Sequence, residues 1–228
     1  MAMHTEMIVP VVRPAPLPET IQRVILRGIS WATYERLLAE HQESSGTHFT
    51  YDRGALEIMV LSAGHEALKH TLALLVEILA EELNVDVYGL GSTTFRREDL
   101  ERGFEPDACF YIQEEALIRG KAEIDLAVDP PPDLVIEIDI TSPSLNKFPI
   151  FAAVGVREVW RYDGARVVIL KLEDSKYVES VESTVLLKIT GDTLTHFVEV
   201  SQQMKRTAWL RHVRKWVRTS GTTGNLSV

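Results

Sequence analysis

Apolar residues recur along residues 63–83 at the spacing of an α-helix. Five leucines share one face of that helix, namely Leu68, Leu72, Leu75, Leu79 and Leu83. Most charged side chains of the segment fall on the other face. Because residues three, four and seven apart lie on one side of a helix, the pattern predicts a long amphipathic helix that packs by its leucine stripe.

Other helices are predicted by capping signals. One is expected at 31–41, after the capping residue Ser30, and a short one at 144–154, with Pro149 in its first turn and Gly155 at its end. A last amphipathic helix carries three apolar residues on one face, Trp209, Val213 and Trp216. That stripe indicates that the helix packs on the rest of the protein.

Short apolar or alternating runs between these helices predict strands. The expected strands are 56–61, 85–90, 107–112, 134–140, 158–162, 166–172 and 185–189. The mixture of helices and strands predicts an α/β or α+β fold with a central mixed β-sheet flanked by helices. A core of this size fits one domain, expected at 21–218.

The ends of the chain and its single cysteine add further expectations. Four prolines within residues 1–20 predict an extended arm, and residues 219–228 lack a core-forming pattern and are expected to be a flexible tail. No apolar run approaches the roughly 20 residues that span a bilayer. Cys109 is the only cysteine, so no internal disulfide can form. Together these features predict a protein of the reducing cytoplasm without a membrane segment.

The net charge of −9 is distributed unevenly. Residues 200–228 contain six Lys or Arg and no Asp or Glu, which leaves 18 basic and 33 acidic residues elsewhere. An acidic body repels phosphate backbones and argues against indiscriminate nucleic-acid binding. It does not exclude a nuclease, because a metal ion in a carboxylate site reverses the local charge.

The most informative segment is Asp133 to Ile140, which reads DLVIEIDI. Strand alternation puts Glu137 and Asp139 on one face. If that face meets water, the two carboxylates need no explanation. If it is buried, they require a cation or a proton.

Asp107 begins another apolar strand, and a carboxylate there could form an oxygen site for Mg²⁺ or Mn²⁺ together with Glu137. Such an ion can activate a water and neutralise charge on a phosphate. Lys147 follows Glu137 by ten residues and could orient that water or balance the phosphate. By itself, Lys147 would be read as a surface lysine.

The sequence resembles a family at several places. The matching stretches are GHE at 64–66, GSTTF at 91–95, FEPDACFYI at 104–112 and the long segment 129–164. They resemble the Uma-type restriction endonuclease family within the PD-(D/E)XK nuclease superfamily, and the resemblance runs from about Ile29 to Arg218.

The resemblance implies a restriction endonuclease-like fold and a set of site residues. Asp107 and Glu137 correspond to the metal-binding carboxylates, the Ile138 carbonyl to a further ligand, and Glu66 to a helix glutamate that helps to hold the metal or its water. The superfamily pattern has lysine at position 139, where this chain has Asp139. The resemblance implies that the lysine has moved to the following helix, as Lys147, and Asp139 could assist the metal.

Two functions follow as hypotheses. The first is a Mg²⁺- or Mn²⁺-dependent DNA endonuclease that hydrolyses phosphodiesters through a metal-activated water, without an organic cofactor. The second is a catalytically inactive member of the fold that serves as a DNA-binding or assembly module. A homodimer is expected because two-fold dimers are the commonest oligomers, with Trp160 and Val168 as candidate exposed apolar residues.

Overall fold

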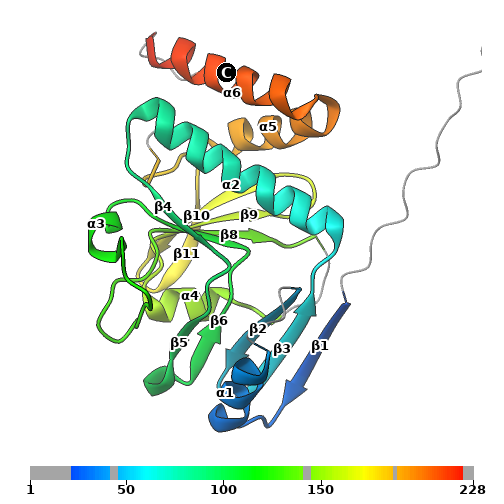
Figure 1. Cartoon of the computed structure of the whole chain (residues 1–228), viewed down its shortest axis with the longest axis vertical. Helices are drawn as coiled ribbons and strands as arrows, with labels where there is room; N and C mark the ends of the chain where they lie inside the picture. The colour runs from blue at the N-terminus through cyan, green and yellow to red at the C-terminus, as the bar shows by residue number, and fades with distance from the viewer. Residues whose placement is uncertain (1–21, 42–45, 141–144, 187–188, 223–228) are drawn as a thin grey trace, which may run out of the picture.

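Two β-sheets organise the chain in the computed structural model (Figure 1). The structure describes residues 22–41, 46–140, 145–186 and 189–222. The arm expected at 1–20 lies outside these residues.

The larger sheet has six strands in the order β11-β10-β9-β8-β7-β4. Their bounds are β4 Tyr88–Gly91, β7 Ala108–Tyr111, β8 Leu134–Ile138, β9 Glu158–Tyr162, β10 Val167–Glu173 and β11 Lys176–Ser180. Strands β8 and β9 are parallel, and the other neighbours are antiparallel. The mixed central sheet predicted from the sequence is therefore confirmed.

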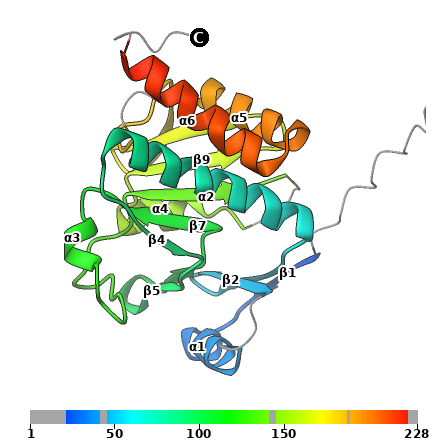
Figure 2. The same cartoon turned by 45° about the horizontal axis from the view of Figure 1, so that its top comes forward.

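Helices cover both faces of the larger sheet. One face carries α2 Ala63–Leu83, α5 Gly191–Gln203 and α6 Arg206–Thr222, as Figures 1 and 2 show. The other face carries α4 Phe148–Val154, whose Ile150 and Phe151 pack with Val135 of β8. Alternation along β8 sends odd-numbered side chains toward α4 and even-numbered ones toward α2.

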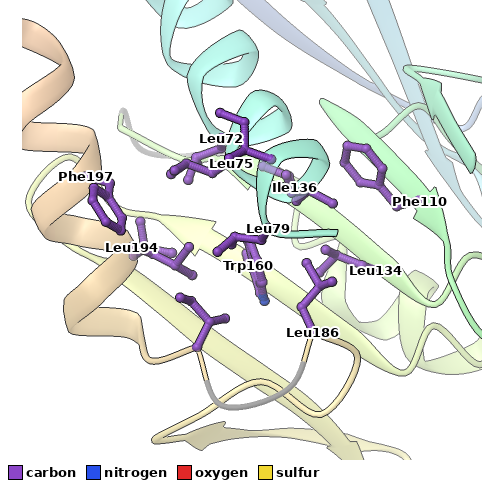
Figure 3. Packing of buried hydrophobic residues seen from close by; sticks show 14 of the residues in the cluster. Leu72, Leu75, Leu79, Phe110, Leu134, Ile136, Trp160, Leu186, Leu194 and Phe197 are labelled. Atoms are coloured by element: carbon purple, nitrogen blue, oxygen red, sulfur yellow. The ribbon is translucent and has the colours of Figure 1, made fainter. Parts of the chain in front are cut away.

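The leucine stripe of α2 packs as predicted except at its end, where Leu83 is exposed. Leu72, Leu75 and Leu79 are buried against the sheet in one cluster with Ile136 and Trp160 (Figure 3). The helix has the predicted bounds because Ser62 caps its start and Asn84 ends it in the left-handed conformation.

The smaller sheet has five antiparallel strands in the order β1-β3-β2-β6-β5. Their bounds are β1 Gln22–Arg27, β2 Thr47–Asp52, β3 Ala55–Val60, β5 Phe95–Arg97 and β6 Arg102–Phe104. Helix α1 Trp31–Glu40 packs Tyr34 on one face, with Phe49, Tyr51 and Leu56. Two short turns of helix complete the described elements, η1 Glu98–Leu100 and α3 Glu115–Ile118.

Several expectations about elements were wrong. Val185 and Leu186 lie in a turn instead of a strand, and the Ser183 N–H donates to the Ile189 carbonyl at 2.8 Å across it. Val185, Leu186 and Ile189 of this run are buried in the core, and their burial produced the strand-like pattern. Residues 187 and 188 lie outside the described residues. The short helix begins at Phe148 and not at residue 144. Helix α5, the short turns η1 and α3, and strands β1, β2, β5, β6 and β11 were not predicted.

The two residues proposed for a dimer surface do not lie on the surface. Trp160 is 0% exposed, and Val168 is 9% exposed. The homodimer stays a prediction without residues assigned to it.

The C-terminal helix also changes the expected tail. Helix α6 continues to Thr222, four residues into the segment expected to be a flexible tail. Two of its arginines, Arg214 and Arg218, pair with Glu81 and Glu82 of α2. No helix among the described residues has both the length and the apolar character to cross a bilayer.

Candidate active site

Strand pairing brings the two predicted carboxylates together. β7 and β8 are antiparallel, with Ala108 opposite Ile136. One step further along this register, Asp107 stands opposite Glu137, and residues directly opposite each other point to the same face of a sheet. Both are buried, with 0% exposure for Asp107 and 8% for Glu137. The buried interpretation of this strand face is therefore the correct one for Glu137.

Lys147 reaches the same place from the start of α4. It is the N-cap residue of that helix, and its ammonium donates to Glu137 Oε2 at 2.8 Å. Pro149 occupies the first helical turn, where its missing N–H costs no intrahelical hydrogen bond. The lysine is 9% exposed, so the pair is a buried one and not a surface contact.

Asp107 is held in place through one of its two carboxylate oxygens. Its Oδ2 accepts from the Ile138 N–H at 2.7 Å and lies 3.3 Å from His65 Nε2. Its Oδ1 is buried and has no hydrogen-bond partner among the described residues. Glu137 is arranged likewise, because Oε2 accepts from Lys147 while Oε1 is buried and has no partner in the described part of the chain. Within the described ranges, each carboxylate thus uses one oxygen for structure, and its other oxygen has no hydrogen-bond partner.

The electrostatics follow from burial and from the opposed charges. Burial raises the pKa of Glu137 to about 7; the Lys147 ammonium opposes this rise and the Asp107 carboxylate adds to it. Burial would also raise the pKa of Asp107, but the hydrogen bond from His65 and the charge of Lys147 hold it below its ordinary value. Burial would lower the pKa of Lys147, but Glu137 and Asp107 together raise it. The ammonium and the Asp107 carboxylate are therefore the charged forms at neutral pH.

The other predicted site residues lie at the margin of this cluster or outside it. Glu66 is exposed on α2 and accepts from Lys69 at 3.0 Å. Asp139 is half-buried and pairs with Arg161 at 2.9 Å. The Ile138 carbonyl lies 3.2 Å from His65 Nε2. The structure thus brings together Asp107, Glu137 and Lys147, with the Ile138 backbone beside them.

Three buried polar residues beside the site were not among the predicted site residues. They are His48, Glu57 and His65. Helix phase could have found His65, because it lies three and seven residues before Leu68 and Leu72 on the leucine stripe. Alternation in β3 could have found Glu57, which faces the side opposite Leu56.

A pocket of about 280 Å³ opens beside the cluster. Its lining combines both signs of charge: Arg23, Glu57, Glu137, Asp139, Lys147 and Arg161. Glu57 also accepts from the Leu145 N–H at 2.8 Å and so connects the smaller sheet to the segment that carries Lys147.

The carboxylate oxygens of Asp107 and Glu137 fit a hard divalent cation that takes only some of its ligands from the protein. Among the described residues, no three His, Cys, Asp or Glu side chains are grouped so that they could hold a metal ion. Mg²⁺ is commonly bound through one or two carboxylates, with water and phosphate oxygens completing its shell. The unpaired oxygens of Asp107 and Glu137 meet that requirement.

Two of the comparisons with known proteins found a match. A family model named Uma2 and described as "Putative restriction endonuclease" matches residues 31–196. A solved structure, "a putative nuclease belonging to DUF820" from Anabaena variabilis ATCC 29413, is 12% identical with a TM-score of 0.49. The match covers 75% of this chain and 99% of that one. No curated protein matches the chain significantly.

Proposed function

Because this chain belongs to the Uma2 family and has a restriction endonuclease-like fold, we propose that it is a divalent-metal-dependent DNA endonuclease with its active site at Asp107, Glu137 and Lys147. One observation carries the proposal: a buried ammonium lies 2.8 Å from a buried carboxylate whose second oxygen has no partner among the residues that the structure describes. Burying three ionisable groups is costly to stability, so their presence favours a functional role.

Asp107 and Glu137 would hold the cation through the oxygens that have no protein partner. Mg²⁺ or Mn²⁺ fits the oxygen ligands, and when bound it would supply Lewis-acid activation of water and neutralise phosphate charge. The second oxygen of each carboxylate stays on its structural donor, which keeps the ligand oxygens in place.

Lys147 contributes a fixed positive charge. Its ammonium has three N–H donors, and Glu137 uses one of them. Because Lys147 also lines the pocket, its other donors are available to a water or a phosphate oxygen there. Lys147, at the start of α4, would thus take the role that the superfamily pattern gives to a lysine at position 139.

Asp139 and Glu66 would have secondary roles. Asp139 pairs with Arg161 at the lining of the pocket, so together they present a neutral pair to the substrate. Glu66 is paired with Lys69 on the exposed side of α2, and a role in holding the metal would require a different rotamer.

A plasmid-nicking assay with Mg²⁺ or Mn²⁺, run beside calorimetric metal titration, tests the proposal. Lys147→Met should lose about 10²–10³ in cleavage rate but still bind metal, because it removes one preorganised charge and no ligand. Asp107→Asn should lose metal and cleavage together.

Asp133→Asn is the matched control. Asp133 is a buried carboxylate at the other end of β8, and its Oδ2 accepts from the N–H groups of Ile112 and Gln113. This variant should lose stability yet cut DNA at the native rate while folded. Native protein that binds metal and cuts no form of DNA would favour the inactive DNA-binding or assembly module instead.

A further inference from the structure

His65 is the buried residue nearest to the cluster that the proposed reaction does not use. It lies in the first turn of α2, where its N–H donates to the Ser62 side chain at 3.2 Å, and the residue is 2% exposed. Its ring reaches residues far along the chain. Nε2 lies 3.3 Å from Asp107 Oδ2 and 3.2 Å from the Ile138 carbonyl oxygen.

The two neighbours define which ring nitrogen carries hydrogen. The Ile138 carbonyl can only accept a hydrogen bond, and the Asp107 carboxylate can only accept one while it is ionised. Nε2 must therefore be an N–H that both oxygens share. The other ring nitrogen, Nδ1, is buried and has no partner among the described residues.

This N–H joins two groups next to the unpaired oxygens. Asp107 Oδ2 already accepts from the Ile138 N–H, so His65 adds a second donor to the same oxygen. With both donors on Oδ2, the carboxylate cannot rotate without losing them, so the position of Oδ1 is fixed as well. The Ile138 carbonyl, a metal ligand by resemblance, is held by the same nitrogen.

We propose that His65 is a positioning residue that clamps Asp107 to the backbone of β8 and presents Asp107 Oδ1 to a divalent cation. The inference rests on the proposed function, since it concerns how the metal ligand is oriented. It assigns His65 no contact with the cation or the substrate. Outer-sphere partners of this kind typically contribute about 10–100-fold to metal affinity.

His48 supplies a matched comparison within the same site. It is also a buried histidine beside Asp107, but its Nδ1 lies 3.9 Å from Oδ1 and makes no hydrogen bond there. If burial of any imidazole near Asp107 were enough, the two histidines would be equivalent. The clamp predicts that only His65 matters to metal affinity.

The experiment measures Mn²⁺ affinity by calorimetry on folded native protein and on His65→Leu, His65→Gln and His48→Leu. His65→Leu should bind Mn²⁺ about 10–100-fold more weakly. His65→Gln should recover most of the affinity, because its amide N–H can occupy the place of Nε2–H. His48→Leu should bind within about threefold of native, a change of less than 1 kcal/mol.

A second readout needs no metal. Long-range ¹H–¹⁵N spectroscopy of the native protein should show His65 protonated at Nε2. An unprotonated Nε2, or a His65→Leu variant that binds Mn²⁺ as tightly as native protein, would overturn the clamp.

The outcomes also separate this inference from the proposed function. If native protein binds Mn²⁺ and His65→Leu weakens binding, but no DNA is cut, the nuclease proposal fails and the clamp stands. If native protein takes up no Mn²⁺ at all, both fail. If DNA is cut and His65→Leu binds normally, only the clamp fails.

Discussion

Replacing Lys147 by methionine tests how the buried charges balance one another. Methionine is also unbranched, is one atom shorter than lysine and lacks the ammonium. In the native protein that ammonium lies 2.8 Å from Glu137 Oε2, and the two side chains are 10% and 11% exposed. The substitution therefore leaves Glu137 and Asp107 facing each other without a counter-charge.

The expected cost depends on pH. At an effective dielectric constant of about 20, two unit charges at this distance attract by about 6 kcal/mol, and breaking a buried pair typically costs about 3–5 kcal/mol. Glu137 can avoid this penalty by taking up a proton. Its folded pKa of about 7 lies above the ordinary 4.5, so its contribution to stability is lost as pH rises through 7. Without the Lys147 ammonium, this loss of stability with rising pH becomes larger.

Urea unfolding of native and variant protein at pH 6 and pH 9, without metal, measures the difference. Lys147→Met should cost less than about 1 kcal/mol at pH 6, where a proton replaces the lost ammonium, and about 3–5 kcal/mol at pH 9. The control is Lys69→Met, which breaks the 3.0 Å pair with Glu66 on more exposed side chains. That exposed pair should contribute about 0–1 kcal/mol at both pH values.

The reasoning would be refuted by either of two results. One is a Lys147→Met variant that loses no more stability than Lys69→Met at pH 9. The other is a loss that is equal at pH 6 and pH 9, because the proton on Glu137 would then have no part in the balance.

Two further predictions concern metal and acid. Mg²⁺ or Mn²⁺ should raise the melting temperature of native protein but not of Glu137→Gln, because a ligand that binds only the folded state stabilises that state. Equal shifts of the two melting temperatures in calorimetry would contradict this prediction. Burial lowers the pKa of His48 to about 4 from 6.5, so the stability that its neutral form provides is complete above pH 6.5 and is lost as pH falls toward 4. When the pH is lowered from 6.5 to 4, the free energy of unfolding measured in urea should fall by about 3 kcal/mol less in His48→Leu than in native protein. Identical pH profiles of the two proteins would contradict the lowered pKa of His48.

The sequence determined those helices and strands whose signals lie within a short stretch of the chain. The helix at 63–83 was predicted with the observed bounds because its signals are local. The leucine periodicity, the Ser62 cap and the residues at its C-terminal end all belong to this one helix. Strand β9 was likewise found at its observed bounds. The apolar run at 185–189 was misread because burial, which the run does indicate, does not specify hydrogen-bond pairing with another strand.

The sequence also pointed out the three residues that we propose as the centre of the site. Asp107 and Glu137 stood out as carboxylates on apolar strands. The spacing of Lys147 from Glu137 made it a candidate, which the family resemblance then matched to the lysine of the superfamily pattern. Pairing of β7 with β8 then placed the two carboxylates opposite each other, which neither strand could specify alone.

Only the tertiary structure decided which neighbours complete the site. Glu66 and His65 are adjacent in sequence, yet the rotation of α2 exposes the first and directs the second toward Ile138, 73 residues away. Asp139 follows Glu137 by two residues but pairs with Arg161 beyond the end of β8. Such contacts depend on how helices and strands pack, because hydrogen-bond distances of about 3 Å are set by three-dimensional placement and not by spacing along the chain.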